Sequence, residues 1–296
     1  MEVEKIGSIT KAASALFMGQ PNLSKAIKEI ENEMGIVIFK RSARGVVPTV
    51  KGAEFLEYAK AVLVQIEKME KLYKTVSTET VSFSISIPRA SYITQVFTQF
   101  LNKLDPSKRL DVRLKETNSM EAINNIIECE YNLGIIRYDE LYEEYFLSLL
   151  NEKKIKYRVL CEFKYMVIVS KDHPLANSKS VSTEELSIYT EVTHGDNSVP
   201  YLSDSYVNNH TSDRNRIYVC ERGSQFDILT SVDNTYMWVS PLPEQVLKRY
   251  NLVQIPCHSD LAKVKDVFIY PQTYKFTEYD AMFLDELENT ISKLFH

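Results

Sequence analysis

The opening of the chain carries two short apolar stripes at helical spacing, separated by a break at Met18-Gly19. The first stripe follows Ser8, a residue type that favours the N-cap of a helix. The second begins near Pro21, which suits a first helical turn, and ends at Gly35, which suits a helix C-terminus. Two helices joined by a tight break, the second with a polar and partly basic face, predict a helix-turn-helix.

The next segment predicts a small hairpin with positive charge. Residues 36–39 and 46–47 are apolar enough for two short strands, and Gly45 provides a turn residue. The basic residues of this segment are Lys40, Arg41 and Arg44. A hairpin beside a helix-turn-helix is typical of a wing, whose cations would lie against the phosphates of DNA.

Apolar side chains then recur about every 3.5 residues over residues 50–77, after the helix-capping residue Thr49. This repeat is typical of the seam of a two-stranded coiled coil. An amphipathic helix packed on its own domain is the alternative, but the many charges around the stripe favour a dimerisation helix. The predicted seam comprises Phe55, Ala59, Val62, Ile66, Met69 and Tyr73.

From about residue 81 the pattern changes to strands that alternate with helices. These elements are predicted over residues 81–87, 96–104, 110–114, 120–127 and 133–136. A β-α-β-α-β succession predicts a parallel sheet with helices on its faces. A second series follows over residues 165–239, and a last helix over residues 281–294. The predicted fold class is therefore α/β after an all-α head.

The net charge also changes sign near residue 78, close to where the strand-and-helix pattern begins. The 296 residues have a net charge of −5, but residues 1–77 carry +3 and residues 78–296 carry −8. A basic head on an acidic body fits a nucleic-acid-binding domain attached to a body with another task. Because no apolar run approaches the ~18 residues of a membrane span and no signal peptide is evident, we expect a cytoplasmic protein without a membrane partner.

Enzyme and metal-site patterns are missing from the sequence. It contains no G-x-S-x-G, H-E-x-x-H, P-loop or G-x-G-x-x-G motif. The four cysteines form no C-x-x-C pair, and the five histidines lack metal-ligand spacing. We therefore predict no catalytic residue, no metal and no cofactor.

Candidate DNA contacts gather on the second predicted helix and the wing. Gln20 and Asn22 stand at the helix N-terminus, where side chains of this motif meet base edges, and either amide can pair with adenine. Ser24, Lys25 and Thr49 are expected to contact phosphates, which position the protein without specifying sequence. Singly, each cation would merely keep a surface soluble; together they predict a DNA interface. The full set is Gln20, Pro21, Asn22, Ser24, Lys25, Lys28, Arg41, Arg44 and Thr49.

The head resembles the signature of the LysR-type transcriptional regulators. The similar stretches are SITKAA from Ser8, QPNLS from Gln20 and MGIVIFKR from Met34, followed by Arg44-Gly45 and Pro48-Thr49. Further along, KDHPLA from Lys171 and residues 223–241 are similar to parts of the family's regulatory domain. The resemblance implies double-stranded DNA, a small-molecule effector and a homodimer or homotetramer as partners, and leaves room for RNA polymerase.

The resemblance also implies the domain organisation. Residues 1–49 would form a winged helix-turn-helix DNA-binding domain, and residues 50–77 a linker and dimerisation helix. Residues 78–296 would form an effector-binding domain that resembles type 2 periplasmic binding proteins. Its two α/β lobes are expected at about residues 81–162 with 270–296, and at about residues 163–269.

The sequence departs from the family at four places. Gly19 stands where serine is usual, Asn22 stands where a small residue is usual, and residues 233–236 replace a Gly-rich loop. Only six residues precede Gly7, where the family has a whole helix. We therefore expect either that the coding frame extends upstream or that this chain binds DNA poorly.

The effector is expected between the lobes, at the carboxyl ends of the strands. Arg89 and Ser91 follow one predicted strand at a helix N-terminus, which suits an anion, and Arg137 ends another strand. The resemblance places effector contacts at these positions and at Thr193, Gly223 and Ser224. Arg89 and Arg137 would instead pair with surface acids in the plainer interpretation, but their joint placement favours a small anionic ligand.

Three classes of function fit these patterns. A DNA-binding regulator controlled by a small molecule is favoured by the helix-turn-helix. A solute-binding protein, or an enzyme on the same two-lobed scaffold, would fit the α/β body alone, without DNA function if the head is truncated. Binding to DNA from beside the protein's own gene would discriminate among them.

Overall fold

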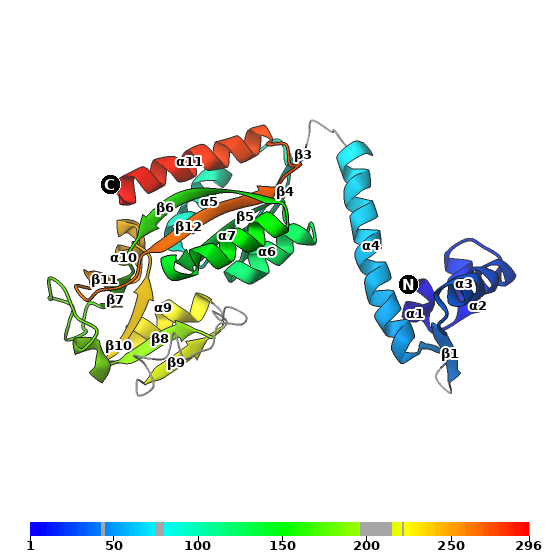
Figure 1. Ribbon diagram of the computed structural model, residues 1–296, viewed down its shortest axis with the longest axis horizontal. Coiled ribbons are helices and arrows are strands. Elements are labelled where there is room, and N and C mark those ends of the chain that lie inside the picture. The colour runs from blue at the N-terminus through cyan, green and yellow to red at the C-terminus, as the bar shows by residue number, and fades with distance from the viewer. Residues whose placement is uncertain (43–44, 75–79, 196–214, 221, 296) are drawn as a thin grey trace. The chain divides into compact units, whose positions relative to one another are not determined.

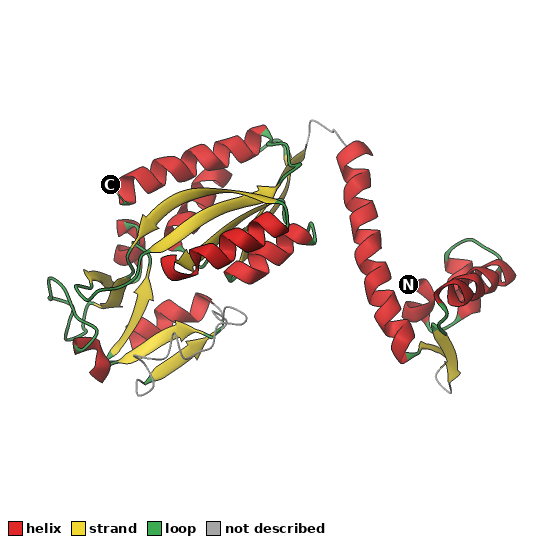
Figure 2. Cartoon of the chain, viewed as in Figure 1, coloured by secondary structure: helices red, strands yellow, loops and turns green. Residues whose placement is uncertain are grey.

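The computed structural model describes residues 1–296 except 43–44, 75–79, 196–214, 221 and 296. The chain divides into two compact units, Met1–Thr78 and Glu79–His296 (Figure 1). Helices make up most of the first unit, whereas the second combines helices with two sheets (Figure 2). Among the described residues, no helix is long and apolar enough to cross a membrane.

The first unit is a helix-turn-helix followed by a two-stranded wing and a long helix. Its elements are α1 (Glu2–Ile6), α2 (Ile9–Ala15), α3 (Gln20–Met34), β1 (Phe39–Ser42), β2 (Gly45–Pro48) and α4 (Val50–Lys74). The Ser8 side chain caps α2 by accepting a hydrogen bond from the Lys11 amide, and Gly35 ends α3 at a positive φ of 65° that glycine tolerates. These elements confirm the predicted winged helix-turn-helix.

The Glu31 side chain lies at the start of the first strand of the wing. Its Oε1 accepts hydrogen bonds from the Ile38 and Phe39 amides at 2.7 and 3.2 Å. The strand starts at Phe39 rather than at residue 36, where it was predicted, and these two hydrogen bonds attach its start to helix α3. The hairpin is antiparallel, and Ser42 pairs with Gly45 at its turn.

Helix α4 is fixed to the wing through Thr49 and Gly52. The Thr49 hydroxyl accepts a hydrogen bond from the Gly52 amide at 2.9 Å and donates one to the Val37 carbonyl at 2.5 Å. Gly52 lies directly against the Ile38 carbonyl, because a Cβ at this position would be 2.0 Å from the oxygen. The helix ends at Lys74, and residues 75–77 of the predicted linker lie outside the described residues.

The first lobe of the second unit is a five-stranded sheet with helices on both faces. Its strands, in sheet order, are β4 (Arg109–Glu116), β3 (Thr80–Ile87), β5 (Leu133–Asp139), β12 (Val264–Pro271) and β6 (Ile155–Phe163). The strands β4, β3 and β5 are parallel, but β12 is antiparallel to both of its neighbours. The predicted parallel sheet is thus confirmed for these three strands, whereas β12 was not predicted from the sequence. The chain enters β12 beside the end of β5, so it must run in the opposite direction.

Two helical layers bury the faces of this sheet. Helices α5 (Ser91–Lys103) and α11 (Glu278–Leu294) cover one face, where the Phe83 ring lies 4.7 Å from Phe100 and 5.1 Å from Phe283. Helices α6 (Ser119–Ile127) and α7 (Glu143–Glu152) cover the other face, and the 3₁₀ turn η1 (Glu140–Tyr142) directly precedes α7 (Figure 1). The strand β6 and helix α7 were not predicted from the sequence.

The second lobe is also a mixed five-stranded sheet. Its order is β11 (Leu252–Pro256), β7 (Met166–Ser170), β10 (Thr235–Val239), β8 (Thr190–His194) and β9 (Arg216–Val219). The strands β10, β8 and β9 are parallel, and β7 is antiparallel to β10 and β11. Helices α9 (Arg222–Ser231) and α10 (Glu244–Arg249) pack on it. The helix predicted near residues 183–186 is a single 3₁₀ turn, η2 (Glu185–Ile188).

The chain passes between the lobes twice. One passage joins β6 to β7 through Lys164 and Tyr165, and the other joins β11 to β12 through residues 257–263. The second lobe was predicted to extend to about residue 269, but β12 belongs to the first sheet from Val264 onward. Residues that follow or end parallel strands of both lobes, such as Arg89, Arg137 and His194, face the space between the lobes.

Candidate functional site

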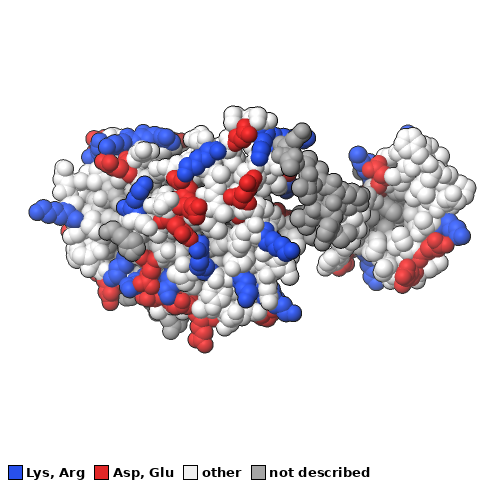
Figure 3. All heavy atoms as spheres, turned by 90° about the horizontal axis from the view of Figure 1, so that it is seen from above, with Lys and Arg blue, Asp and Glu red and all other residues white. Residues whose placement is uncertain are grey.

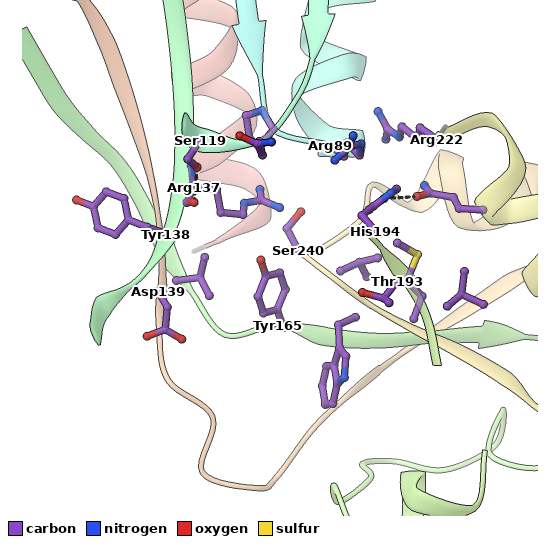
Figure 4. Close-up of a pocket in the computed structure, with 18 of the residues that line it drawn as sticks. Arg89, Ser119, Arg137, Tyr138, Asp139, Tyr165, Thr193, His194, Arg222 and Ser240 are labelled. Atoms are coloured by element: carbon purple, nitrogen blue, oxygen red, sulfur yellow. Dashed lines mark hydrogen bonds between the residues drawn. The ribbon is translucent and has the colours of Figure 1, made fainter. Parts of the chain in front are cut away.

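A cavity of about 810 Å³ lies between the two lobes (Figure 4). Its walls come from the carboxyl ends of strands in both sheets and from the first turns of α5, α6 and α9. This is the position at which α/β folds bind ligands, and the volume lies within the roughly 300–1,000 Å³ of small-molecule sites. The cavity is therefore the candidate ligand site of the second unit.

The cavity brings together most of the residues predicted to contact an effector. Arg89, Ser91, Arg137 and Thr193 line it. Gly223 and Ser224 are not among the lining residues, although their neighbours Arg222 and Gln225 are. Helix α9 begins at Arg222, two residues before the helix start expected at Ser224, and the Arg222 side chain lines the cavity.

Arg137 lines the cavity as one half of a buried ion pair. Its Nε and Nη2 donate to Asp266 Oδ1 and Oδ2 at 2.7 and 2.6 Å, and Asp266 is fully buried. The Tyr92 hydroxyl donates to the same carboxylate. Burial alone would lower the pKa of Arg137, but the Asp266 carboxylate outweighs this effect and raises it. The floor of the cavity is consequently charged but nearly neutral overall.

Arg222 reaches from the second lobe to the first. Its Nη1 donates to Glu116 and to Thr94 Oγ1 at 2.7 Å, and its Nη2 donates to Ser91 Oγ at 2.7 Å. The hydroxyl of Ser91, a predicted effector contact, therefore already accepts a hydrogen bond. Sequence reasoning missed Arg222 and Glu116 because the two residues are 106 positions apart and no local motif connects them.

The wall formed by the second lobe combines polar and aromatic groups. The His194 ring lies between the Val219 carbonyl, 3.3 Å from Nδ1, and Gln225 Oε1, 3.1 Å from Nε2 (Figure 4). Arg216 Nε donates to Glu191 Oε2 at 3.1 Å on the neighbouring strand. Tyr165, on the passage between the lobes, also lines the cavity, and burial raises the pKa of its phenol. These groups would orient a ligand by hydrogen bonding and stacking.

In the described part of the chain, no three His, Cys, Asp or Glu side chains are grouped so that they could hold a metal ion. The visible face of the second unit mixes basic and acidic side chains without a patch of one sign (Figure 3). This face therefore offers no electrostatic footprint of the kind that a polyanion requires.

The first turn of α3 presents the residues predicted to contact base edges. Gln20, Pro21 and Asn22 are exposed, and Gln20 Nε2 donates to Ser24 Oγ at 2.7 Å. The N-cap Gly19 provides no side-chain hydrogen bond, so the first amides of α3 have no side-chain cap. An exposed helix N-terminus with amide side chains fits the recognition helix of a helix-turn-helix.

The predicted phosphate contacts differ in how they are held. Lys25, Lys28 and Arg41 are exposed, and Lys25 lies 3.7 Å from Glu29 in a solvated pair. Thr49 is half-buried and its hydroxyl already caps α4, so its observed role is structural. Arg44 lies outside the described residues.

The predicted dimer seam is partly open to solvent. Phe55 and Ala59 are half-buried, whereas Val62 and Ile66 remain 58% and 43% exposed. The side chains of Met69 and Tyr73 lie outside the described residues. Leu56 faces the other way and is buried in the head. Helix α4 thus presents apolar surface that its own unit does not cover.

Comparison with known proteins supports this division of the chain. Residues 1–53 match the family described as bacterial regulatory helix-turn-helix protein, lysR family, and residues 89–220 match the LysR substrate binding domain. An uncharacterized HTH-type transcriptional regulator, YnfL of Escherichia coli (strain K12), is 27% identical over 182 residues, which cover 60% of this chain and 57% of the relative. The chain therefore spans somewhat more than half of this relative's length.

Two further proteins match over more of their length. The HTH-type transcriptional regulator AlsR of Bacillus subtilis (strain 168) is 22% identical over 246 residues, covering 82% of this chain and 77% of the relative. The structure of full-length CbnR in complex with its target DNA aligns with a TM-score of 0.59, at 15% identity, over 98% of this chain and 96% of that one. At this identity the structural match shows a shared fold.

Proposed function

Because the chain belongs to the LysR-type family of transcriptional regulators, we propose that it binds DNA in a sequence-specific way under the control of a small-molecule effector. The observation that carries this proposal is the combination of two sites in one chain. An exposed α3 N-terminus beside a wing occurs together with a ligand-sized cavity between two α/β lobes. Neither a solute-binding protein nor an enzyme requires the first of these sites.

The proposed DNA interface comprises α3 and the wing. Gln20 and Asn22 would contact base edges in the major groove, and Lys25, Lys28 and Arg41 would contact phosphates. Gln20 already donates to Ser24, which holds its amide near the start of the helix. The structurally similar CbnR was solved with its target DNA, which supports the same use of this fold here.

The proposed effector is a small anion that binds in the interlobe cavity. Its described lining includes Arg89, Arg137, Arg216 and Arg222 but only the acids Asp139 and Glu191. Arg137, Arg216 and Arg222 pair with Asp266, Glu191 and Glu116, so a bound carboxylate or phosphate would compete with these acids for the guanidinium groups. The α5 N-terminus, where Ser91 is the first helical residue, adds a positive dipole end.

The protein is further proposed to be cytoplasmic and to assemble as a homodimer or homotetramer through α4. The exposed apolar side chains Val62 and Ile66 support this arrangement, because they lie on the stripe that a coiled-coil partner would cover. Two paired heads would contact two half-sites of DNA, one helical turn or a multiple of it apart.

The test is fluorescence anisotropy of the full-length protein with DNA from beside its own gene, in the presence and absence of small carboxylates. We expect salt-sensitive binding whose affinity changes with at least one carboxylate and not with the corresponding amide. Ser91→Ala should weaken that response, whereas Ser107→Ala, outside the cavity, should leave it unchanged. Carboxylate binding without any DNA binding would instead support a small-molecule-binding protein.

A further inference from the structure

One side chain that lines the cavity connects the two lobes. Arg222 is the first residue of α9 in the second lobe, and its guanidinium donates to Ser91, Thr94 and Glu116 of the first lobe. Ser91 and Thr94 lie in the first turn of α5, and Glu116 is the last residue of β4. Three acceptors from two elements thus converge on one cation, whose side chain is only 16% exposed.

The position of Arg222 is unfavourable for its own helix. A cation in the first turn opposes the helix dipole, and the first turn of α9 contains no acidic side chain. The acceptors that offset this disadvantage belong to the other lobe. Among the residues that the structure describes, the hydrogen-bond acceptors of this guanidinium all belong to the first lobe.

Two other arginines of the cavity show the opposite arrangement. Arg137 on β5 pairs with Asp266 on β12 within the first sheet, and Arg216 on β9 pairs with Glu191 on β8 within the second sheet. A change in the angle between the lobes would leave both of these pairs intact. The same change would pull Arg222 away from Glu116, because the two residues move with different lobes.

The Arg222–Glu116 contact lies where it can strongly resist a change in the angle between the lobes. Figure 4 shows Arg222 well away from Tyr165, which lies on a passage between the lobes. A contact far from this connecting segment resists separation with a longer lever arm than one beside it. Opening and closing of two domains about such connecting segments is a common response to ligands.

We propose that Arg222 and Glu116 form an interlobe latch that holds the effector domain closed. When the pair breaks, the lobes separate and the cavity opens. Its regulatory meaning rests on the proposed function: an anionic effector that contacts Ser91 meets Arg222 at the same point and competes with Glu116 for it. Effector binding and lobe position are thereby coupled through one guanidinium.

The distance between the lobes tests the latch without any ligand or DNA. Spin labels would be placed on Cys129 in the first lobe and on Lys248→Cys in the second, with Cys220→Ser and Cys257→Ser to limit labelling elsewhere. The full-length labelled protein would be mixed with excess unlabelled protein, so that only distances within one subunit are measured by electron–electron double resonance.

We expect Glu116→Gln and Arg222→Gln each to shift the distance distribution to longer values, and the double variant to shift it no further. Arg216→Gln is the matched control, because it breaks an ion pair of the same cavity inside one lobe; its distribution should equal that of the wild type. Glu116→Gln is nearly isosteric, and circular dichroism would verify that each variant is folded.

An unchanged distribution in both Glu116→Gln and Arg222→Gln would overturn the proposal, as would an equal shift in Arg216→Gln. These outcomes do not depend on DNA or effector, so a failure of the latch is distinct from a failure of the proposed regulatory function. Conversely, if the anisotropy experiment detected no DNA binding, the spin-label distances would still show whether Arg222 and Glu116 hold the lobes together.

Discussion

The Arg137 guanidinium and the Asp266 carboxylate form a bidentate pair on the floor of the interlobe cavity, with hydrogen bonds of 2.7 and 2.6 Å. The carboxylate is fully buried, and the Phe163 ring centroid lies 4.9 Å from the guanidinium. A buried ion pair of this kind adds little to folding stability compared with apolar residues of similar volume. Removal of one partner is strongly destabilising, because it leaves the other charge buried and unpaired. Each member therefore depends on the other more than on its neighbours.

Removal of the charge of Asp266 should strongly destabilise the second unit. Asp266→Asn leaves Arg137 buried without its counter-ion, and we expect the free energy of unfolding to fall by about 3–5 kcal/mol. Urea denaturation followed by circular dichroism measures this change. Asp111→Asn is the control, because it breaks the exposed pair with Arg113 and should cost less than about 1 kcal/mol. Equal effects of the two substitutions would contradict the assigned role of the buried pair.

Stability should decline in mild acid through His173. The ring is 5% exposed, Nδ1 accepts a hydrogen bond from the Leu175 amide, and burial lowers the pKa of the imidazole. The unfolded chain therefore binds a proton near pH 6.5 while the folded chain does not, so stability is lost as the pH falls below that value. Unfolding free energies at pH 7.5 and pH 5 should differ less in His173→Gln than in the wild type. His258→Gln, at an exposed position, should retain the wild-type difference.

The junction of α4 and the wing should not tolerate a larger residue at Gly52. A Cβ there would lie 2.0 Å from the Ile38 carbonyl oxygen, so Gly52→Ala must displace the helix or the wing. We expect a loss of about 1–3 kcal/mol, typical of overpacking, measured by hydrogen exchange of the head amides. Gly223→Ala is the matched control, because no atom lies within 4 Å of the corresponding Cβ. Unchanged exchange in Gly52→Ala would show that the junction yields easily.

Self-association should depend on the apolar stripe of α4. Ile66→Asp introduces a charge at a position that a partner helix would bury, where an unpaired charge is costly. Sedimentation velocity at micromolar concentration should show an oligomeric wild type and a smaller species for this variant. Lys51→Asp, an exposed substitution at the start of the same helix, should sediment like the wild type. A monomeric wild type would contradict the proposed coiled coil.

The sequence predicted the head well because its signals are local. Ser8, Pro21 and Gly35 mark helix ends within a few residues of the positions that they control, and the observed helices begin and end beside them. The start of β1 was placed three residues too early, and the side chain that holds the amides of Ile38 and Phe39 at its observed start, Glu31, is seven or eight residues away. Local pattern reasoning does not include such contacts.

The second unit shows where local reasoning ends. The three parallel strands and their helices follow from hydrophobic periodicity, but the direction of β12 depends on where the chain returns from the other lobe. Likewise, four of the six predicted effector residues line the cavity because strand ends are recognisable in the sequence. The partners of Arg137 and Arg222 lie 129 and 106 positions away, so only the fold brings them together.

The dependence of DNA affinity on salt in full-length wild type, Gln20→Ala and Arg41→Ala tests the central claim most directly. Anisotropy would be measured with DNA from beside the gene and with unrelated DNA between 50 and 200 mM salt, and the account predicts salt-sensitive wild-type binding with a preference for the first DNA. Arg41→Ala should weaken binding to both and reduce the slope of log K against log salt by about 0.9. Gln20→Ala should instead reduce the preference between the two, by about 1–3 kcal/mol. Salt-independent binding, or a sequence preference that Gln20→Ala leaves untouched, would contradict the account.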